Sequence, residues 1–185
     1  MNGNKFIKYI PNILTVINMS SGIGAILFLF QSEHPQKKLI ASALIILGAF
    51  SDFFDGFFAQ KFNAASAMGK QLDSFADIIT FGIAPILLIN YTLECVPNVF
   101  ITIPSLIFIM AGAYRLARYN LNDFSKHSIG LPITGAGIAL TIYCIIYPLW
   151  TTYQCRNFFI AITAGFIILL SFLMISKKKM RRIFF

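Results

Sequence analysis

Long apolar stretches recur along the whole chain, and they restrict its possible folds more than any other feature. Six of them approach the ~20 residues that a helix needs to cross about 30 Å of hydrocarbon. They cover residues 10–30, 39–62, 71–93, 99–120, 132–150 and 158–176. The run 39–50 is apolar at consecutive positions, whereas the strands of a membrane barrel alternate. The sequence therefore predicts an all-α integral membrane protein, a bundle of six transmembrane helices forming one domain over residues 1–185.

The basic residues predict the orientation of this bundle, because Lys and Arg in short loops stay on the cytoplasmic side. With both termini cytoplasmic, only Lys37, Lys38 and Arg156 of the fifteen basic residues lie on the opposite side. The formal net charge is +8. Because the cations gather at predicted membrane ends, we expect them to contact anionic lipid headgroups and not nucleic acid.

The acidic residues are few and concentrated. The chain has seven, and four of them lie between residues 52 and 77. Asp52 and Asp55 are three residues apart near the cytoplasmic end of the second stretch, and Asp73 and Asp77 are four apart near the start of the third. Each pair shares one helical face. Since a short turn joins the two stretches, we expect antiparallel neighbours whose four carboxylates converge near the inner boundary of the bilayer.

Such a cluster needs compensation, since one charged residue at the membrane centre costs about 2.5–3.5 kcal/mol on insertion scales. Mg²⁺ or Mn²⁺ would supply it, because these ions take carboxylate oxygens and share substrate phosphates. Two such ions could bridge a pyrophosphate. Gly56 and Gly69 would let a nucleotide approach the backbone, and Ala59 extends the small face. The alternatives are helix packing for the glycines and a polar seam for the acids.

The spacing of these residues resembles the signature of the CDP-alcohol phosphatidyltransferase family, which has an arginine where this chain has Gln60. The shared positions are Asp52, Asp55, Gly56, Ala59, Gly69, Asp73 and Asp77. Further segments are similar to the phosphatidylserine synthase branch of the family. They are residues 11–12 with Asn18, 71–85, 115–120 and 130–132.

The resemblance implies transfer of the phosphatidyl group of CDP-diacylglycerol to the L-serine hydroxyl, with release of CMP. It implies that Asp52, Asp55 and Asp73 hold one divalent ion, that Asp73 and Asp77 contribute to a second, and that Asp77 is the general base. It also suggests a homodimer. We expect the protein in a bacterial cytoplasmic membrane, with the site facing the cytoplasm as the basic residues predict. The implied CDP-diacylglycerol site comprises Thr15, Asn18, Gly56, Ala59, Gln60, Ser66 and Gly69. For Thr15 and Asn18, hydrogen bonding between helices is an equal alternative.

Two arginines complete the predicted site. Arg115 and Arg118 are three residues apart at the inner end of the fourth stretch, and we assign them to the serine carboxylate or the lipid phosphate. Ordinary positive-inside flanking is the alternative. Two other functions stay open: the same chemistry with glycerol 3-phosphate or inositol phosphate as acceptor, and a cation transporter that uses the aspartates as an ion site.

Overall fold

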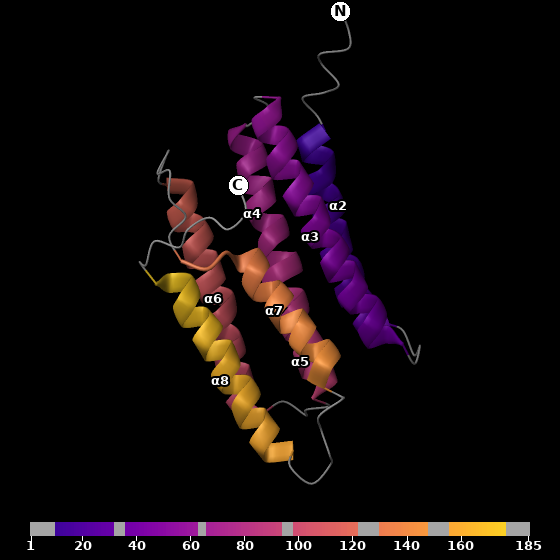
Figure 1. Ribbon diagram of the computed structural model, residues 1–185, viewed down its shortest axis with the longest axis vertical. Coiled ribbons are helices and arrows are strands. Elements are labelled where there is room, and N and C mark those ends of the chain that lie inside the picture. Colours follow the sequence, from indigo (N-terminus) through magenta and orange to yellow (C-terminus); the bar gives the residue numbers. More distant parts are fainter. Residues whose placement is uncertain are drawn as a thin grey trace, which may run out of the picture.

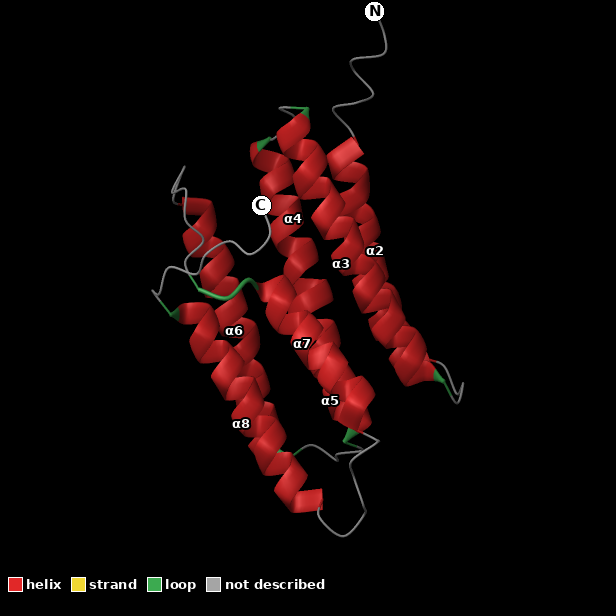
Figure 2. Cartoon of the chain, viewed as in Figure 1, coloured by secondary structure: helices red, strands yellow, loops and turns green. Residues whose placement is uncertain are grey.

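The structure is a computed structural model that describes residues 10–31, 36–62, 66–93, 98–121, 130–147 and 156–176. All regular secondary structure in these ranges is helical (Figure 2). The helices are α2 (Ile10–Gln31), α3 (Lys37–Lys61), α4 (Ala67–Asp77), η1 (Ile78–Ile83), α5 (Ala84–Thr92), α6 (Val99–Leu121), α7 (Ile133–Ile146) and α8 (Arg156–Ile175).

Five helical segments in the described ranges are long and apolar enough to cross a membrane: α2, α3, the continuous run α4–η1–α5, α6 and α8. The all-helical membrane fold is therefore confirmed. The expected span 132–150 forms the shorter helix α7, whose 14 residues extend roughly 21 Å. Residues 148–150 of that expectation lie outside the described ranges.

The helices form two long pairs with the third segment between them. α2 packs along α3, and α6 packs along α8. η1 contacts α2 and α3 of the first pair and α6 of the second, so the α4–η1–α5 run lies between the two pairs (Figure 1). α5 and η1 also pack against α7. Because the chain reverses at each connection, the starts of α2, α4 and α7 point toward the same side as the ends of α3, α6 and α8.

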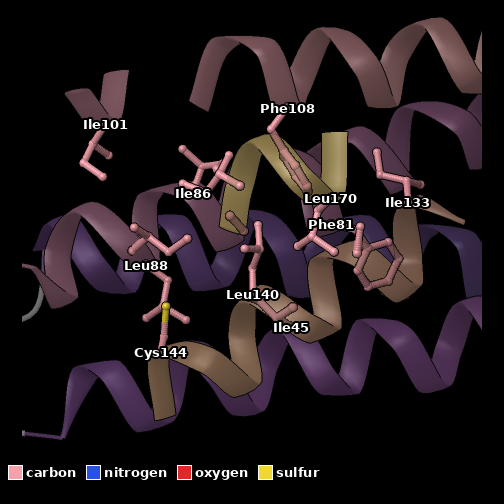
Figure 3. Packing of buried hydrophobic residues seen from close by; sticks show 14 of the residues in the cluster. Ile45, Phe81, Ile86, Leu88, Ile101, Phe108, Ile133, Leu140, Cys144 and Leu170 are labelled. Atoms are coloured by element: carbon pink, nitrogen blue, oxygen red, sulfur yellow. The ribbon is translucent and has the colours of Figure 1, made fainter. Parts of the chain in front are cut away.

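The centre of the bundle closes around η1. Figure 3 shows Phe81 of η1 among the buried side chains of the core, which also includes Leu140 and Phe108. A Cβ atom added at Gly22 of α2 would lie 2.3 Å from Thr80 Oγ1, and one at Gly137 of α7 would lie 2.6 Å from the Phe81 carbonyl oxygen. Glycine at both positions therefore lets α2 and α7 approach the η1 backbone closely.

The third segment is not a regular α-helix. Directly after Asp77 it passes through six residues of π-helix, Ile78–Ile83, in which Thr80, Phe81 and Gly82 are all buried. Three consecutive residues of a helix point in different directions. The burial of all three therefore requires that η1 packs against neighbours on more than one side. Short π-helical segments are rare and occur frequently at functional sites.

Candidate active site

Three aspartates from two helices meet at the end of the bundle for which the charges predict a cytoplasmic location. Asp52 and Asp55 come from α3 and Asp73 from α4, and one carboxylate oxygen of each lies within 4.8 Å of the others. Asp55 is buried, whereas Asp52 and Asp73 are half-buried. The predicted convergence of acids from the second and third segments is thus observed. All three donors are carboxylate oxygens, the ligand type that hard divalent cations prefer.

Asp77 lies one turn beyond Asp73 and is also buried. Its charged surroundings are Asp52, Asp73 and Asp55, together with the positive charge of Arg115. Among the described residues, neither Asp73 Oδ1 nor Asp77 Oδ1 has a hydrogen-bond partner, although both atoms are buried. Since buried polar atoms are nearly always satisfied, these oxygens mark a place that fits a bound cation or polar substrate.

Two threonines, one on α2 and one on α7, form hydrogen bonds to the α3 carboxylates. Thr15 Oγ1 of α2 donates to Asp55 Oδ2 at 2.9 Å, and Thr134 Oγ1 of α7 donates to Asp52 Oδ2 at 3.0 Å. Such outer contacts fix the orientation of metal-binding carboxylates. Thr15 therefore forms the hydrogen bond between helices that was one of its two expected roles. Its contact with CDP-diacylglycerol stays a prediction. Sequence reasoning missed Thr134, whose only signal was its position two residues after Pro132.

Ser66 and Gly69 form the start of α4. The Gly69 N–H donates to Ser66 Oγ at 2.9 Å, and this cap begins the helix at Ala67, earlier than the residue 71 expected from the apolar pattern. A Cβ at Gly69 would lie 2.9 Å from Ser66 Oγ, so the glycine lets the cap form. The predicted contact of both residues with CDP-diacylglycerol remains a prediction.

In the described structure, the part of the predicted CDP-diacylglycerol site on α3 has free space beside Gly56. A Cβ at Gly56 would meet no atom of the described structure within 4 Å. Ala59 lies half-buried one turn after Asp55. Gln60 belongs to α3, but its side chain is outside the described part of the structure.

Asn18 of α2 is completely buried against α3 and η1. The residue has no exposed surface, and its carbonyl oxygen accepts a 3.0 Å hydrogen bond from Thr80 Oγ1. Its amide group faces Gly48, where a Cβ would lie 2.9 Å from Asn18 Oδ1. Neither amide atom has a partner within the described ranges. The contact of Asn18 with CDP-diacylglycerol stays a prediction.

The two arginines point to different neighbours. Arg115 is buried, interacts electrostatically with Asp77, and its Nε has no hydrogen-bond partner among the described residues. Arg118 Nη1 donates to the Ile175 carbonyl oxygen at 3.3 Å, at the end of α8, and its guanidinium lies 5.8 Å from the Tyr114 ring centre. Arg115 therefore lies close to the carboxylate of Asp77.

Fold and site together define an integral membrane protein with a carboxylate cluster that could hold a metal ion. A model of the CDP-alcohol phosphatidyltransferase family matches residues 8–178, and the chain belongs to this family.

Three relatives show the extent of the similarity. The chain is 38% identical over 176 residues to CDP-diacylglycerol–serine O-phosphatidyltransferase of Bacillus subtilis, covering 93% of this chain and 89% of the relative. It is 33% identical over 135 residues to the enzyme of the same name from Methanocaldococcus jannaschii, covering 73% and 60%. It is 30% identical over 189 residues to archaetidylserine synthase of Methanothermobacter thermautotrophicus, covering 99% and 75%.

Proposed function

We propose that this protein transfers the phosphatidyl group of CDP-diacylglycerol to the hydroxyl of L-serine and releases CMP. The observation that carries the proposal is the meeting of three carboxylates from α3 and α4 within 4.8 Å, beside the unpartnered Asp77 Oδ1. Family membership supports the phosphatidyl transfer. The names of the relatives from Bacillus subtilis and Methanocaldococcus jannaschii support serine as the acceptor.

Asp52, Asp55, Asp73 and Asp77 would hold two divalent cations, Mg²⁺ or Mn²⁺. When bound, these ions would neutralise the pyrophosphate and polarise the phosphorus under attack. Thr15 and Thr134 keep the α3 carboxylates oriented through their hydrogen bonds. The open space beside Gly56 would accept the CDP group, while the acyl chains stay in lipid.

Asp77 acts as the general base in this proposal. The serine hydroxyl oxygen forms a bond to the phosphorus of the phosphatidyl group, and the bond from that phosphorus to the CMP oxygen breaks. The hydroxyl proton passes to Asp77, whose Oδ1 has no other partner in the described structure. CMP leaves with the bonding electron pair. Asp77 is buried, which keeps bulk water from competing for the phosphatidyl group.

The proposed setting is a bacterial cytoplasmic membrane, with six spans, both termini cytoplasmic and the site on the cytoplasmic side. A homodimer is the proposed assembly. Reporter fusions at each terminus test the topology, and mass measurement in detergent tests the dimer. An extracytoplasmic terminus or a monomer would contradict these points without affecting the proposed chemistry.

The reaction is tested with purified protein in proteoliposomes containing CDP-diacylglycerol and Mn²⁺. We expect CMP release that requires L-serine and stops on chelation. Release with glycerol 3-phosphate or inositol phosphate, and not with serine, would assign another acceptor. Cation flux without CMP release would identify a transporter. Asp77→Asn keeps the shape of the side chain but removes the proposed base. This variant should lose CMP release while retaining binding of CDP-diacylglycerol.

A further inference from the structure

The first turn of α7 is a candidate binding site for an anionic group. Its flanking residue Pro132 provides no side-chain cap. The N–H groups of Ile133, Thr134 and Gly135 have no acceptor within the helix, because the first turn of any helix leaves its donors unused. These donors and the helix dipole favour a negative charge at this end.

This first turn lies deep beside α6 and not at the membrane surface. A Cβ at Gly112 would lie 2.5 Å from Ile133 Cδ1, so α7 begins at the level of Gly112. Gly112 is nine residues, or roughly 13 Å, before the end of α6 at Leu121. Asp52 lies equally far before the end of α3 at Lys61. The start of α7 therefore reaches the depth of the aspartates, and Thr134 contacts Asp52 directly.

Arg115 supplies an independent reason to expect an anion here. It follows Gly112 by three residues on the same face of α6, so it lies one turn beyond Ile133 toward the cytoplasmic end. The residue is only 9% exposed, and its Nε lacks a hydrogen-bond partner within the described ranges. A buried guanidinium with an unused N–H matches a ligand with paired oxygens.

We propose that Arg115 and the first turn of α7 bind the carboxylate of the acceptor amino acid, and so select an alcohol that carries a carboxylate. This inference rests on the proposed function. Arg115 interacts with Asp77, and Thr134 of the same first turn touches Asp52, so a carboxylate held here adjoins the reacting centre. In serine only two carbons separate the carboxylate carbon from the hydroxyl oxygen, which places the hydroxyl beside Asp77.

Within the described ranges, the charges favour a carboxylate over a phosphate at this position. Arg118, the next arginine on α6, donates to the carbonyl oxygen of Ile175 at the end of α8. The described part of the subsite therefore combines the buried guanidinium of Arg115 with a helix end. That set suits a planar ion with a single negative charge, whereas a dianionic phosphate usually gathers several basic side chains.

The first test compares L-serine with serinol, which keeps the amine and the hydroxyl but has no carboxylate. CMP release with each alcohol is measured for the wild type, for Arg115→Gln and for the charge-matched control Lys61→Gln. Lys61 is exposed at the end of α3. Arg115→Gln should lower kcat/KM for serine by roughly 10- to 100-fold, mainly through KM, and should lower kcat/KM for serinol by a much smaller factor, because serinol has no carboxylate to lose a partner. Lys61→Gln should match the wild type with both alcohols.

A second pair of variants tests the helix end without touching Arg115. A Cβ at Gly135 would have only ordinary contacts, the nearest at 3.4 Å from Pro132 Cγ, so Gly135→Ala and Gly135→Asp should both fold. The aspartate would occupy the first-turn donors and raise the KM for serine by roughly 10-fold relative to the alanine variant.

Each outcome has a distinct meaning. A wild type that uses serinol as efficiently as serine overturns the carboxylate subsite but leaves the proposed function standing. The subsite is also overturned if Arg115→Gln impairs serine and serinol equally while Gly135→Asp behaves like Gly135→Ala. A wild type that releases no CMP with serine, but does so with glycerol 3-phosphate, contradicts the proposed function itself.

Discussion

Replacing Thr15 by valine isolates the contribution of one hydroxyl group to the aspartate cluster. The side chain keeps its shape, but the hydroxyl group is lost, which lies 2.9 Å from Asp55 Oδ2 and 3.0 Å from the Pro11 carbonyl oxygen of its own helix. A buried hydrogen bond to a charged group contributes about 1.5–3 kcal/mol. At about 1.4 kcal/mol per factor of ten, this loss corresponds to roughly 10- to 100-fold weaker metal binding. The same range is typical when an outer partner of a metal ligand is removed.

The assay is CMP release in proteoliposomes as a function of Mn²⁺ concentration. We expect the half-activating Mn²⁺ concentration to rise by roughly 10- to 100-fold in Thr15→Val, with activity largely recovered at high Mn²⁺. Thr141→Val is the matched control, because Thr141 is fully buried but donates to Gly137 within its own helix. An unchanged Mn²⁺ requirement in Thr15→Val, or an equal shift in the control, would refute the reasoning.

Three further variants test the cluster, the packing and the motif. Asp73→Asn should abolish CMP release and the rise in thermal stability caused by Mn²⁺, because one of three clustered carboxylates is lost; wild-type Mn²⁺ binding measured by calorimetry would contradict this. Gly22→Ala should lower the unfolding free energy by about 1–3 kcal/mol, since its Cβ would lie 2.7 Å from Thr80 Cα. Gly24→Ala, with its nearest contact at 3.8 Å, is the control, and equal melting temperatures for the two variants in detergent would be inconsistent with the close approach. Gln60→Arg should keep or raise turnover of CDP-diacylglycerol because it adds a cation for pyrophosphate, and a large loss would show that this position is misaligned with the family motif.

The pattern of apolar residues was sufficient to predict the five long helical segments, and the spacing of the acids predicted that Asp52, Asp55 and Asp73 would meet. Hydrophobic stretches of membrane length have few alternatives, and spacings of three and four residues place side chains on one face. The cap at Ser66 was also readable in principle, because serine before a helix is a common signal. The prediction nevertheless began this helix too late, since polar residues at its start broke the apolar pattern.

Other features depend on contacts between distant segments, which no local pattern reveals. The π-helical turns of η1 lie between Gly22 of α2 and Gly137 of α7, two residues far apart in sequence. The deep start of α7 is positioned by Ile133 against Gly112 of α6. The same start brings Thr134 to Asp52, which explains why the sequence pattern alone did not identify that threonine.

The π-helical segment also decides where the third membrane segment can change its length. In an α-helix each residue turns the chain by about 100°, whereas a π turn accommodates one residue more. Deleting a single residue within Ile78–Ile83 would therefore let this segment become regular α-helix and leave the direction of α5 relative to Asp77 nearly unchanged. A deletion among residues 84–87 would instead turn the buried Leu88 and Ile89 by about 100° relative to Asp77 and remove them from their contacts. Functional proteins that differ in length here should therefore differ within the π-helical segment and not within α5.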